Sequence, residues 1–174
     1  MSPGRRDALI LGTVALGAAA VGGVAGALFL QSNSGAAALL ASHFPDLSGT
    51  PRRLIDWQGK ALLCNFWATW CAPCREEMPL LDTAHQRYSP KGLQIVGIAV
   101  DSADNVRKFA GIVPVGYPLL LGNASTIDLM RGLGNSSGGL PFTVLLDRHG
   151  RLVERKLGPL SAADLEAGVQ RLLQ

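Results

Sequence analysis

A pair of cysteines stands where an apolar, strand-like run of residues gives way to a helical pattern. Residues 61–67 are almost continuously apolar, and Cys71-Ala72-Pro73-Cys74 follows them shortly before the helical stretch begins. This order places Cys71 at or just before the first helical turn and Cys74 one turn inside it. The chain must therefore fold so that a buried strand delivers two sulfur atoms to the start of a helix.

The start of a helix favours the ionised form of a thiol. Its backbone amides are unpaired and the helix dipole is positive there, so the pKa of a cysteine falls from about 8.5 into a range of roughly 3.5 to 7.5. We expect Cys71 to be the attacking thiolate and Cys74 to be the resolving thiol that breaks a mixed disulfide with a substrate. Pro73 lacks an amide hydrogen and has a φ angle suited to a first turn, so it shapes the bridge between the two sulfurs.

Two other uses of the pair, a structural crosslink and half of a zinc site, fit the sequence less well. A disulfide that closes only four residues stabilises the fold by roughly 2 kcal/mol, against more than 4 kcal/mol for a long loop. A closed zinc site needs four ligands. The other candidate ligands do not occur in pairs at a metal-like spacing: Cys64, His43, His85 and His149. The sequence therefore favours a redox-active pair and predicts no metal, and Cys64 is interpreted as a small buried hydrophobe.

The pattern after residue 44 predicts a single α/β domain, because about 130 residues suffice to bury a core. Strand-like runs occupy residues 61–67, 93–100, 142–146 and 152–157. Helical stretches occupy residues 72–88, 104–112, 126–133 and 162–173. Turn-forming residues at 147–150 predict that the last two runs form a hairpin. The order of elements predicts a mixed central sheet with helices on both faces.

The motif around the cysteines resembles a known family. Residues 66–79, with Trp70 before the pair and Glu77-Met78-Pro79 after it, are similar to the TlpA/ResA-type membrane-anchored thioredoxin-like thiol:disulfide oxidoreductases, as are residues 140–147. The resemblance extends over residues 44–174. It implies a thioredoxin-like fold and an enzyme that works through a Cys71–Cys74 disulfide with no bound cofactor.

The same resemblance implies a substrate-binding role for four residues. Pro141 aligns with the cis-proline that such proteins place against the dithiol, and Leu140 before it offers backbone groups to an extended substrate segment. From the residues alone, Pro141 fits an edge-strand or turn proline equally well. Trp70, directly before the nucleophile, is expected to form part of the surface that a substrate meets, together with Pro73.

Catalysis also needs a group that moves a proton as the resolving thiol ionises. Thioredoxins carry a buried aspartate on the strand before the dithiol, and this chain has Asn65 there. Glu77 lies three residues after Cys74 and so on nearly the same helix face. The family is proposed to tune its cysteines with a glutamate at this place, and burial would raise its pKa toward neutrality. We expect the catalytic set Cys71, Cys74 and Glu77; a solvated glutamate is the alternative.

The N-terminal part of the chain predicts a membrane anchor. A basic segment at residues 1–7 precedes 23 uncharged, mostly apolar residues at 8–30. As a helix this run spans roughly 34 Å, which exceeds a hydrocarbon core of about 30 Å. Residues 31–43 are interpreted as a tether. We therefore expect one transmembrane helix followed by a thioredoxin-like domain at residues 44–174.

The arginines before the apolar run keep the N-terminus cytoplasmic and send the domain outside. The expected location is the cell inner membrane, single-pass, with the catalytic domain in the periplasm or another extracytoplasmic space. The alternative is a cleaved signal peptide, for which Ala36, Ala37 and Ala38 offer small residues at a cleavage site.

The net charge of +3 is too small and too dispersed to predict nucleic-acid binding. By resemblance, the expected partners are proteins whose disulfides are reduced, as in cytochrome c or copper-protein maturation, and a membrane reductant transporter as electron donor. Two alternatives of other classes stay open: a copper-handling module and a thiol peroxidase. The peroxidase alternative lacks the Pro-x-x-x-Thr-x-x-Cys pattern of that class.

Overall fold

Strand β3 (Ala61–Trp67) lies at the centre of a five-stranded sheet with the order β5-β4-β3-β6-β7. The computed structural model describes residues 34–174, and the expected anchor at residues 8–30 lies outside them. The other strands of this sheet are β4 (Leu93–Ala99), β5 (Leu119–Leu121), β6 (Phe142–Leu146) and β7 (Leu152–Leu157). A separate two-stranded ribbon pairs β1 (His43–Pro45) with β2 (Pro51–Arg53).

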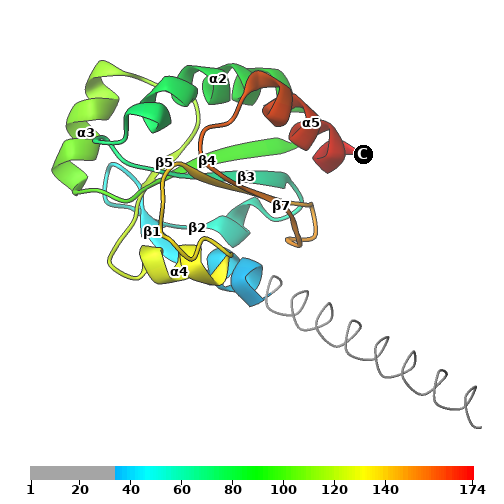
Figure 1. The fold of residues 1–174 in the computed structure, drawn as a ribbon, viewed down its shortest axis with the longest axis horizontal. Coiled ribbons are helices and arrows are strands. Elements are labelled where there is room, and N and C mark those ends of the chain that lie inside the picture. Colours follow the sequence, from blue (N-terminus) through cyan, green and yellow to red (C-terminus); the bar gives the residue numbers. More distant parts are fainter. Residues whose placement is uncertain (1–33) are drawn as a thin grey trace, which may run out of the picture.

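The helices follow the strands in regular alternation (Figure 1). They are α2 (Ala72–Tyr88), α3 (Ala103–Ile112), α4 (Thr126–Gly132) and α5 (Ala162–Leu173), with short 3-10 turns η1 (Leu54–Trp57) and η2 (Ser89–Lys91). Each predicted strand and helix is present, and the bounds of α2 and α5 match the predicted ranges. Strand β3 is parallel to β4 and antiparallel to β6, so the sheet is mixed as predicted.

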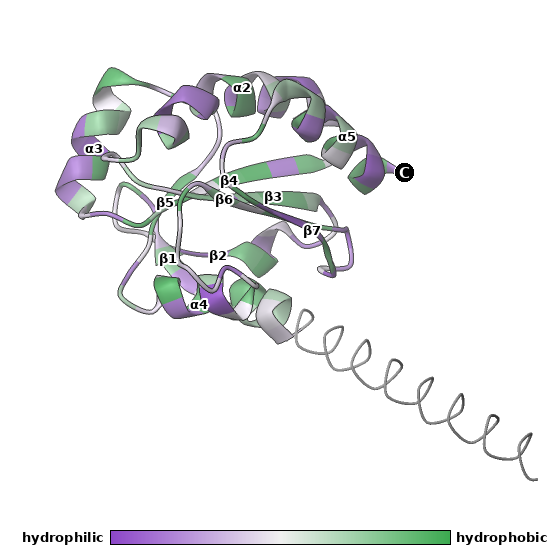
Figure 2. Cartoon of the chain, viewed as in Figure 1, coloured by the Kyte–Doolittle hydropathy of each residue, from purple (hydrophilic) through white to green (hydrophobic). Residues whose placement is uncertain are grey.

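Strand β3 lies between β4 and β6, and every one of its side chains is buried. A strand covered on both faces cannot alternate polar and apolar residues, which explains its nearly continuous apolar run. Figure 2 shows hydrophobic residues along the central strands and hydrophilic ones on β7 at the edge. Strand β7 alternates between half-buried and exposed positions, as an edge strand with one covered face should.

Two apolar cores flank the sheet, one on each face. Helices α2, α3 and α5 cover the first core, which includes Trp67, Met78 and Val169. The second core lies on the other face, beneath α4 and the segment before β1, and includes Phe66 and Met130. Figure 1 shows these two layers on opposite sides of the strands. The helices therefore lie on both faces, as the order of elements predicted.

Residues 34–41, expected to belong to a flexible tether, are helical and pack on the domain. Ala36 and Leu39 are fully buried in the second core. The backbone at Gly35 approaches α4 so closely that a Cβ there would lie 2.4 Å from the carbonyl oxygen of Gly132. The packing of the domain thus reaches back to residue 35, while the domain boundary at residue 44 stays a prediction.

Within residues 34–174, no helix has the length and apolarity needed to cross a bilayer. The transmembrane helix was predicted at residues 8–30, outside this range, and so stays a prediction.

We predict that Leu39→Ala lowers the free energy of unfolding by about 2–5 kcal/mol, because it leaves a cavity in a closed core. Urea unfolding of the full chain in detergent measures this loss. Ile112→Ala is the matched control: its side chain is 79% exposed, so its effect should stay within about 0.5 kcal/mol. Equal effects of the two substitutions would show that residues 34–41 do not belong to the folded domain.

Candidate active site

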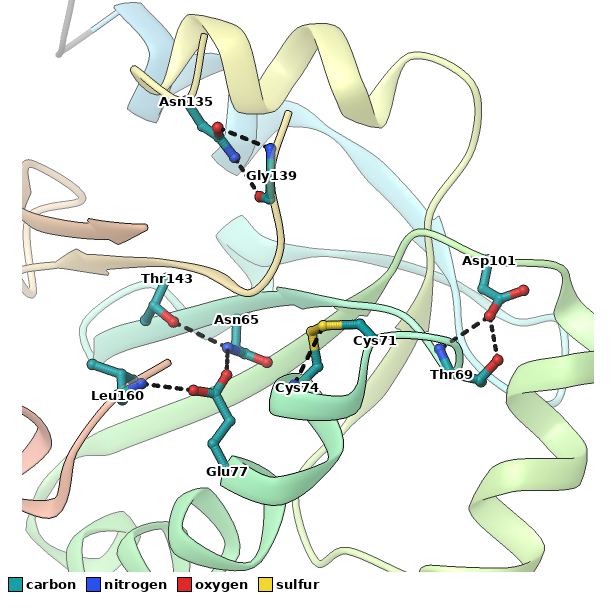
Figure 3. The surroundings of a disulfide bond; sticks show 10 residues. All are labelled: Asn65, Thr69, Cys71, Cys74, Glu77, Asp101, Asn135, Gly139, Thr143 and Leu160. Atoms are coloured by element: carbon teal, nitrogen blue, oxygen red, sulfur yellow. Dashed lines mark hydrogen bonds between the residues drawn. A yellow bond between two sulfur atoms is a disulfide. The ribbon is translucent and has the colours of Figure 1, made fainter. Parts of the chain in front are cut away.

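The two cysteines form a disulfide at the start of α2 (Figure 3). Their Cα atoms are 5.3 Å apart. Cys71 is the N-cap residue of the helix, and the backbone N–H of Cys74 donates a hydrogen bond to its Sγ at 3.3 Å. Pro73 occupies the first turn, where a missing amide hydrogen costs nothing. The sequence therefore placed both sulfurs correctly relative to the helix.

The two sulfur-bearing residues differ in exposure. Cys74 is completely buried, whereas Cys71 retains 6% of its surface. Trp70, directly before Cys71, is 68% exposed, which is unusual for so large an apolar side chain. A molecule arriving from solvent therefore meets Trp70 and the sulfur of Cys71 first, and it reaches Cys74 only through Cys71.

The loop between β3 and α2 is fixed by Asp101, which lies just after β4. Its Oδ2 accepts hydrogen bonds from the backbone N–H of Thr69 at 3.0 Å and from the Thr69 hydroxyl (Figure 3). Partial burial acts to raise the pKa of Asp101, but hydrogen bonds from Thr69, Asn105 and Ser102 outweigh it and lower that pKa. Asp101 is therefore ionised at neutral pH and holds the loop that carries Trp70 and Cys71.

Glu77 lies in a buried position one turn after Cys74 on α2. One carboxylate oxygen accepts a hydrogen bond from Asn65 Nδ2 at 2.7 Å, and the other accepts one from the backbone N–H of Leu160 at 2.8 Å. Burial raises the pKa of Glu77, and the hydrogen bonds from Leu160 and Asn65 reverse only part of that rise. The carboxyl group is thus suited to gain and lose a proton closer to neutral pH than an exposed glutamate.

Asn65 connects Glu77 to the neighbouring strand. The Nδ2 group donates to Glu77 and also to Thr143 Oγ1 on β6 at 3.0 Å. The Oδ1 atom is buried and has no hydrogen-bond partner in the described structure. Figure 3 shows this oxygen on the side of Asn65 that faces the first turn of α2, where Cys74 lies. The strand position that holds an aspartate in thioredoxins here holds the amide that binds the glutamate.

Leu140 and Pro141 join in a cis peptide bond at the start of β6, as the resemblance implied. Asn135 shapes the preceding loop, because its side chain donates to the Gly139 carbonyl and accepts from the Gly139 amide (Figure 3). Leu140 packs between the two apolar cores and is half-buried. The backbone before β6 is thereby held in a defined conformation.

Cys64 is buried within β3, in agreement with its interpretation as a small hydrophobe. Burial raises the pKa of its thiol to about 12, so it stays protonated at neutral pH. Among residues 34–174, no three His, Cys, Asp or Glu side chains are grouped so that they could hold a metal ion.

Three residues that support the site were not identified from the sequence: Thr143, which binds Asn65, Leu160, which binds Glu77, and Asp101, which binds Thr69. Thr143 and Leu160 are far from Glu77 along the chain, and no spacing rule connects them. Asp101 had a detectable signal, since an acidic residue directly after a buried parallel strand lies at the same sheet edge as the dithiol. The site residues that the sequence did predict lie together at one end of the sheet.

We predict that Asn65→Leu destabilises the protein at neutral pH by about 1–3 kcal/mol, because a buried carboxylate loses a donor. The substitution raises the folded-state pKa of Glu77 further above its unfolded value. The loss of stability should therefore grow as pH rises through the folded-state pKa of Glu77 in the parent protein. At acid pH, where Glu77 is protonated in both states, only the pH-independent part of the loss should remain, which includes the lost hydrogen bond to Thr143. Urea unfolding across pH measures it.

Thr143→Val is the matched control for Asn65→Leu, because Glu77 keeps both of its donors. Its loss of stability should not change with pH. A loss in Asn65→Leu that is equally independent of pH would contradict the assignment.

Solved structures with a similar fold are known. A thiol:disulfide interchange protein of the thioredoxin family from Chlorobium tepidum TLS matches with a TM-score of 0.68 and 29% identity, over 76% of this chain and 93% of that one. A thioredoxin-related protein from Neisseria meningitidis serogroup B matches with a TM-score of 0.67 and 31% identity, over 74% and 97% of the two chains. The fold is therefore thioredoxin-like.

Sequence relatives agree with the structural ones. Thiol-disulfide oxidoreductase ResA of Bacillus thuringiensis (strain Al Hakam) is 31% identical over 128 residues, which are 73% of this chain and 72% of that protein. ResA of Geobacillus thermodenitrificans (strain NG80-2) is 30% identical over 73% of this chain and 71% of that protein. The model of the Redoxin family matches residues 33–170. The chain therefore belongs to the Redoxin family, with relatives that are ResA-type thioredoxin-like oxidoreductases.

Proposed function

We propose that this thiol:disulfide oxidoreductase reduces disulfide bonds of partner proteins outside the cytoplasm, while residues 8–30 anchor it in the cell inner membrane. The observation that carries the thiol–disulfide exchange chemistry is the asymmetry of the pair, and the reducing direction is proposed from the likeness to ResA-type proteins. Cys71 is the helix N-cap and retains 6% of its surface, whereas Cys74 is completely buried one turn inside the helix. Cys71 is therefore the proposed attacking sulfur, and Cys74 is the one that resolves the mixed disulfide.

The reaction starts from the reduced dithiol. The Cys71 thiolate attacks one sulfur of a partner disulfide, which forms a mixed disulfide and releases the partner's other sulfur as a thiolate that takes up a proton. Cys74 then loses its proton and attacks Cys71 Sγ, so that the Cys71–Cys74 disulfide forms and the partner leaves as a dithiol. Two electrons pass to the partner, and an external dithiol donor must return them to the enzyme.

Glu77 is the proposed acceptor for the proton of Cys74. It lies one turn away on the same helix, and its raised pKa brings proton exchange closer to neutral pH. Asn65 is the proposed positioning residue that holds the carboxylate while it changes charge. In the reverse half of the cycle, the protonated carboxyl would return the proton to the Cys74 thiolate.

The substrate surface is proposed to comprise Trp70, Pro73 and the backbone of Leu140 before Pro141. An extended substrate segment would pair with the free backbone groups of Leu140 by strand addition. Trp70 offers an exposed apolar contact directly before Cys71 in the chain. This surface selects for backbone and apolar groups, as expected of an enzyme that acts on unfolded segments of proteins.

The proposed chemistry needs no bound cofactor, because the disulfide itself carries the electrons. The proposed partners are apoproteins whose cysteines must be reduced before they bind haem or copper. A membrane reductant transporter is the proposed donor that restores the dithiol. These assignments derive from the likeness to ResA-type proteins and from the predicted anchor.

We predict that Cys74→Ser accumulates mixed disulfides with partner proteins at neutral pH, because Cys71 still attacks and nothing resolves the product. Non-reducing electrophoresis and mass spectrometry of membranes measure the trapped species. Cys71→Ser should trap none, and Cys64→Ser should behave as the parent protein because its sulfur is buried. Trapping by Cys71→Ser at an equal level would reverse the assigned roles.

We predict that Glu77→Gln slows reduction of a protein disulfide about 10- to 100-fold at neutral pH, because the Cys74 proton loses its acceptor. In the parent protein the rate of resolution should rise as pH increases through the raised pKa of Glu77. That limb of the pH profile should be absent in the variant. Stopped-flow tryptophan fluorescence with an oxidised peptide measures both.

Glu76→Gln is the matched control for Glu77→Gln: the residue is adjacent, exposed and changed in the same way. Its rate and pH profile should equal those of the parent protein. Loss of the same limb in Glu76→Gln, or its survival in Glu77→Gln, would exclude Glu77 as the acceptor.

A further inference from the structure

The folded domain begins almost directly after the apolar run. That run ends at residue 30, and the chain is already packed on the domain at Gly35 and Ala36. Five residues cover at most about 18 Å even when fully extended. If residues 8–30 span the bilayer, as proposed above, the domain cannot move far from the membrane surface. The part of the domain next to residue 34 must then face the lipid.

The structure identifies this part of the domain. The side chain of Leu40 lies against the β6–β7 turn, where a Cβ on Gly150 would be 2.5 Å from Leu40 Cδ1. Gly35 lies against Gly132 at the end of α4. The helix at residues 34–41 therefore begins against the end of α4 and reaches the β6–β7 turn near its other end, and Figure 1 shows residues after 33 entering at that side of the sheet.

The surface at the β6–β7 turn is basic. At the β6–β7 turn the hairpin carries Arg148 and Arg151 with one acidic residue, Asp147, whereas Lys156 lies toward the other end of β7, opposite Thr143, and pairs with Asp164. Arg151 pairs with Asp147, and Arg171 of α5 pairs with Glu154. Arg148 has no carboxylate partner within residues 34–174, and its side chain is exposed at the turn.

A cavity of about 370 Å³ opens between this turn and the C-terminal end of α5. Its lining includes Arg148, His149, Arg151 and Arg171, with Asp147 on one side. Guanidinium groups bind phosphate oxygens in pairs of hydrogen bonds. The surface therefore suits the phosphodiester headgroups of anionic phospholipids.

The dithiol lies at the opposite end of the sheet. Cys71 follows the C-terminal end of β3, whereas Leu62 near the N-terminal end pairs with Leu146, immediately before the β6–β7 turn. Seven residues of strand separate these ends, which is about 20 Å. A domain that rests on the β6–β7 turn therefore presents Trp70 and Cys71 away from the membrane.

We propose that the basic end of the domain, formed by the β6–β7 turn and the C-terminal end of α5, rests on anionic phospholipid headgroups and fixes the dithiol facing away from the bilayer. This inference rests on the membrane anchor of the proposed function. It narrows the substrates to disulfides in proteins, or in protein domains, that stand clear of the membrane surface. A disulfide at the level of the lipid headgroups would not reach Cys71.

The test places a fluorescent reporter at each end of the full-length protein in vesicles. In the oxidised protein the disulfide and the buried Cys64 do not react with a maleimide, so a new cysteine is labelled alone. His149→Cys reports on the β6–β7 turn, and Asp104→Cys, on the first turn of α3, reports on the dithiol end. A nitroxide on the lipid headgroup should quench the reporter at 149 strongly and the reporter at 104 weakly.

The role of charge is tested with Arg148→Glu, combined with the reporter at 149. In vesicles of phosphatidylglycerol mixed with phosphatidylcholine, this substitution should lower the equilibrium constant for contact between the β6–β7 turn and the lipid surface by at least about fivefold. High salt or phosphatidylcholine alone should reduce quenching in the parent protein, because screening or removal of lipid charge weakens the contact. Arg148→Ala should lower the same equilibrium constant. Lys108→Glu on α3 is the charge-matched control and should have no effect on it.

Each outcome separates this inference from the proposed function. Flotation of the full chain with vesicles reports the anchor, and reduction of insulin disulfides reports the oxidoreductase activity. A protein that floats and is active, but whose two reporters are quenched equally, overturns the orientation alone. Strong quenching at 149 that ignores Arg148→Glu and lipid charge overturns the electrostatic contact, and a chain that does not float overturns the anchor and the orientation together.

Discussion

The burial of β3 on both faces is the constraint on which the active site depends. All seven residues of the strand are buried and paired with β4 on one side, and five of them are also paired with β6 on the other. The loop that leaves the strand is tied at two further points, by the hydrogen bond from Val100 N–H to the Trp67 carbonyl at 2.7 Å and by the contact of Thr69 with Asp101. Since the loop cannot shift, Cys71 is held at the helix N-cap. The hydrophobic packing of β3 thus fixes the position of Cys71 in the electrostatic field at the start of α2.

The group proposed to transfer the proton, Glu77, belongs to the helix rather than to the strand. Because Glu77 and Cys74 belong to the same helix, one turn apart, α2 itself fixes the position of the carboxyl group relative to the resolving sulfur. The strand supplies the Asn65 amide instead, and the loop before α5 supplies the Leu160 N–H. Both donors favour the charged carboxylate and burial favours the neutral one, and burial prevails. The carboxyl group is therefore held in place in both protonation states, which suits a group that must exchange a proton repeatedly.

The sequence predicted the features that depend on a periodic hydrophobic pattern or on residues close together along the chain. The bounds of α2 and α5 and the hairpin of β6 and β7 follow from periodicity, capping residues and turn residues, whereas the sequence left open whether Glu77 is buried or solvated. Strand β5 was not predicted, because three leucines between Pro118 and Gly122 are too few to show a pattern. The pairing of Glu77 with the Leu160 amide was also missed, since a backbone donor has no sequence signature. Residues 34–41 were taken for a linker because small residues dominate there, although two of their side chains fill a core.

The mixed sheet separates the two ends of the domain chemically. Because β6 is antiparallel to β3, the residues before β6 lie beside the dithiol and the turn after β6 lies at the far end. The first end carries the cis Leu140–Pro141 bond and exposed Trp70, which belong to the proposed substrate surface. The far end carries the arginines and meets the chain as it enters the fold. Strand direction alone therefore keeps any group that binds the far end of the domain away from the reactive sulfur. Such a group can hold the domain in place without competing with a substrate for the dithiol.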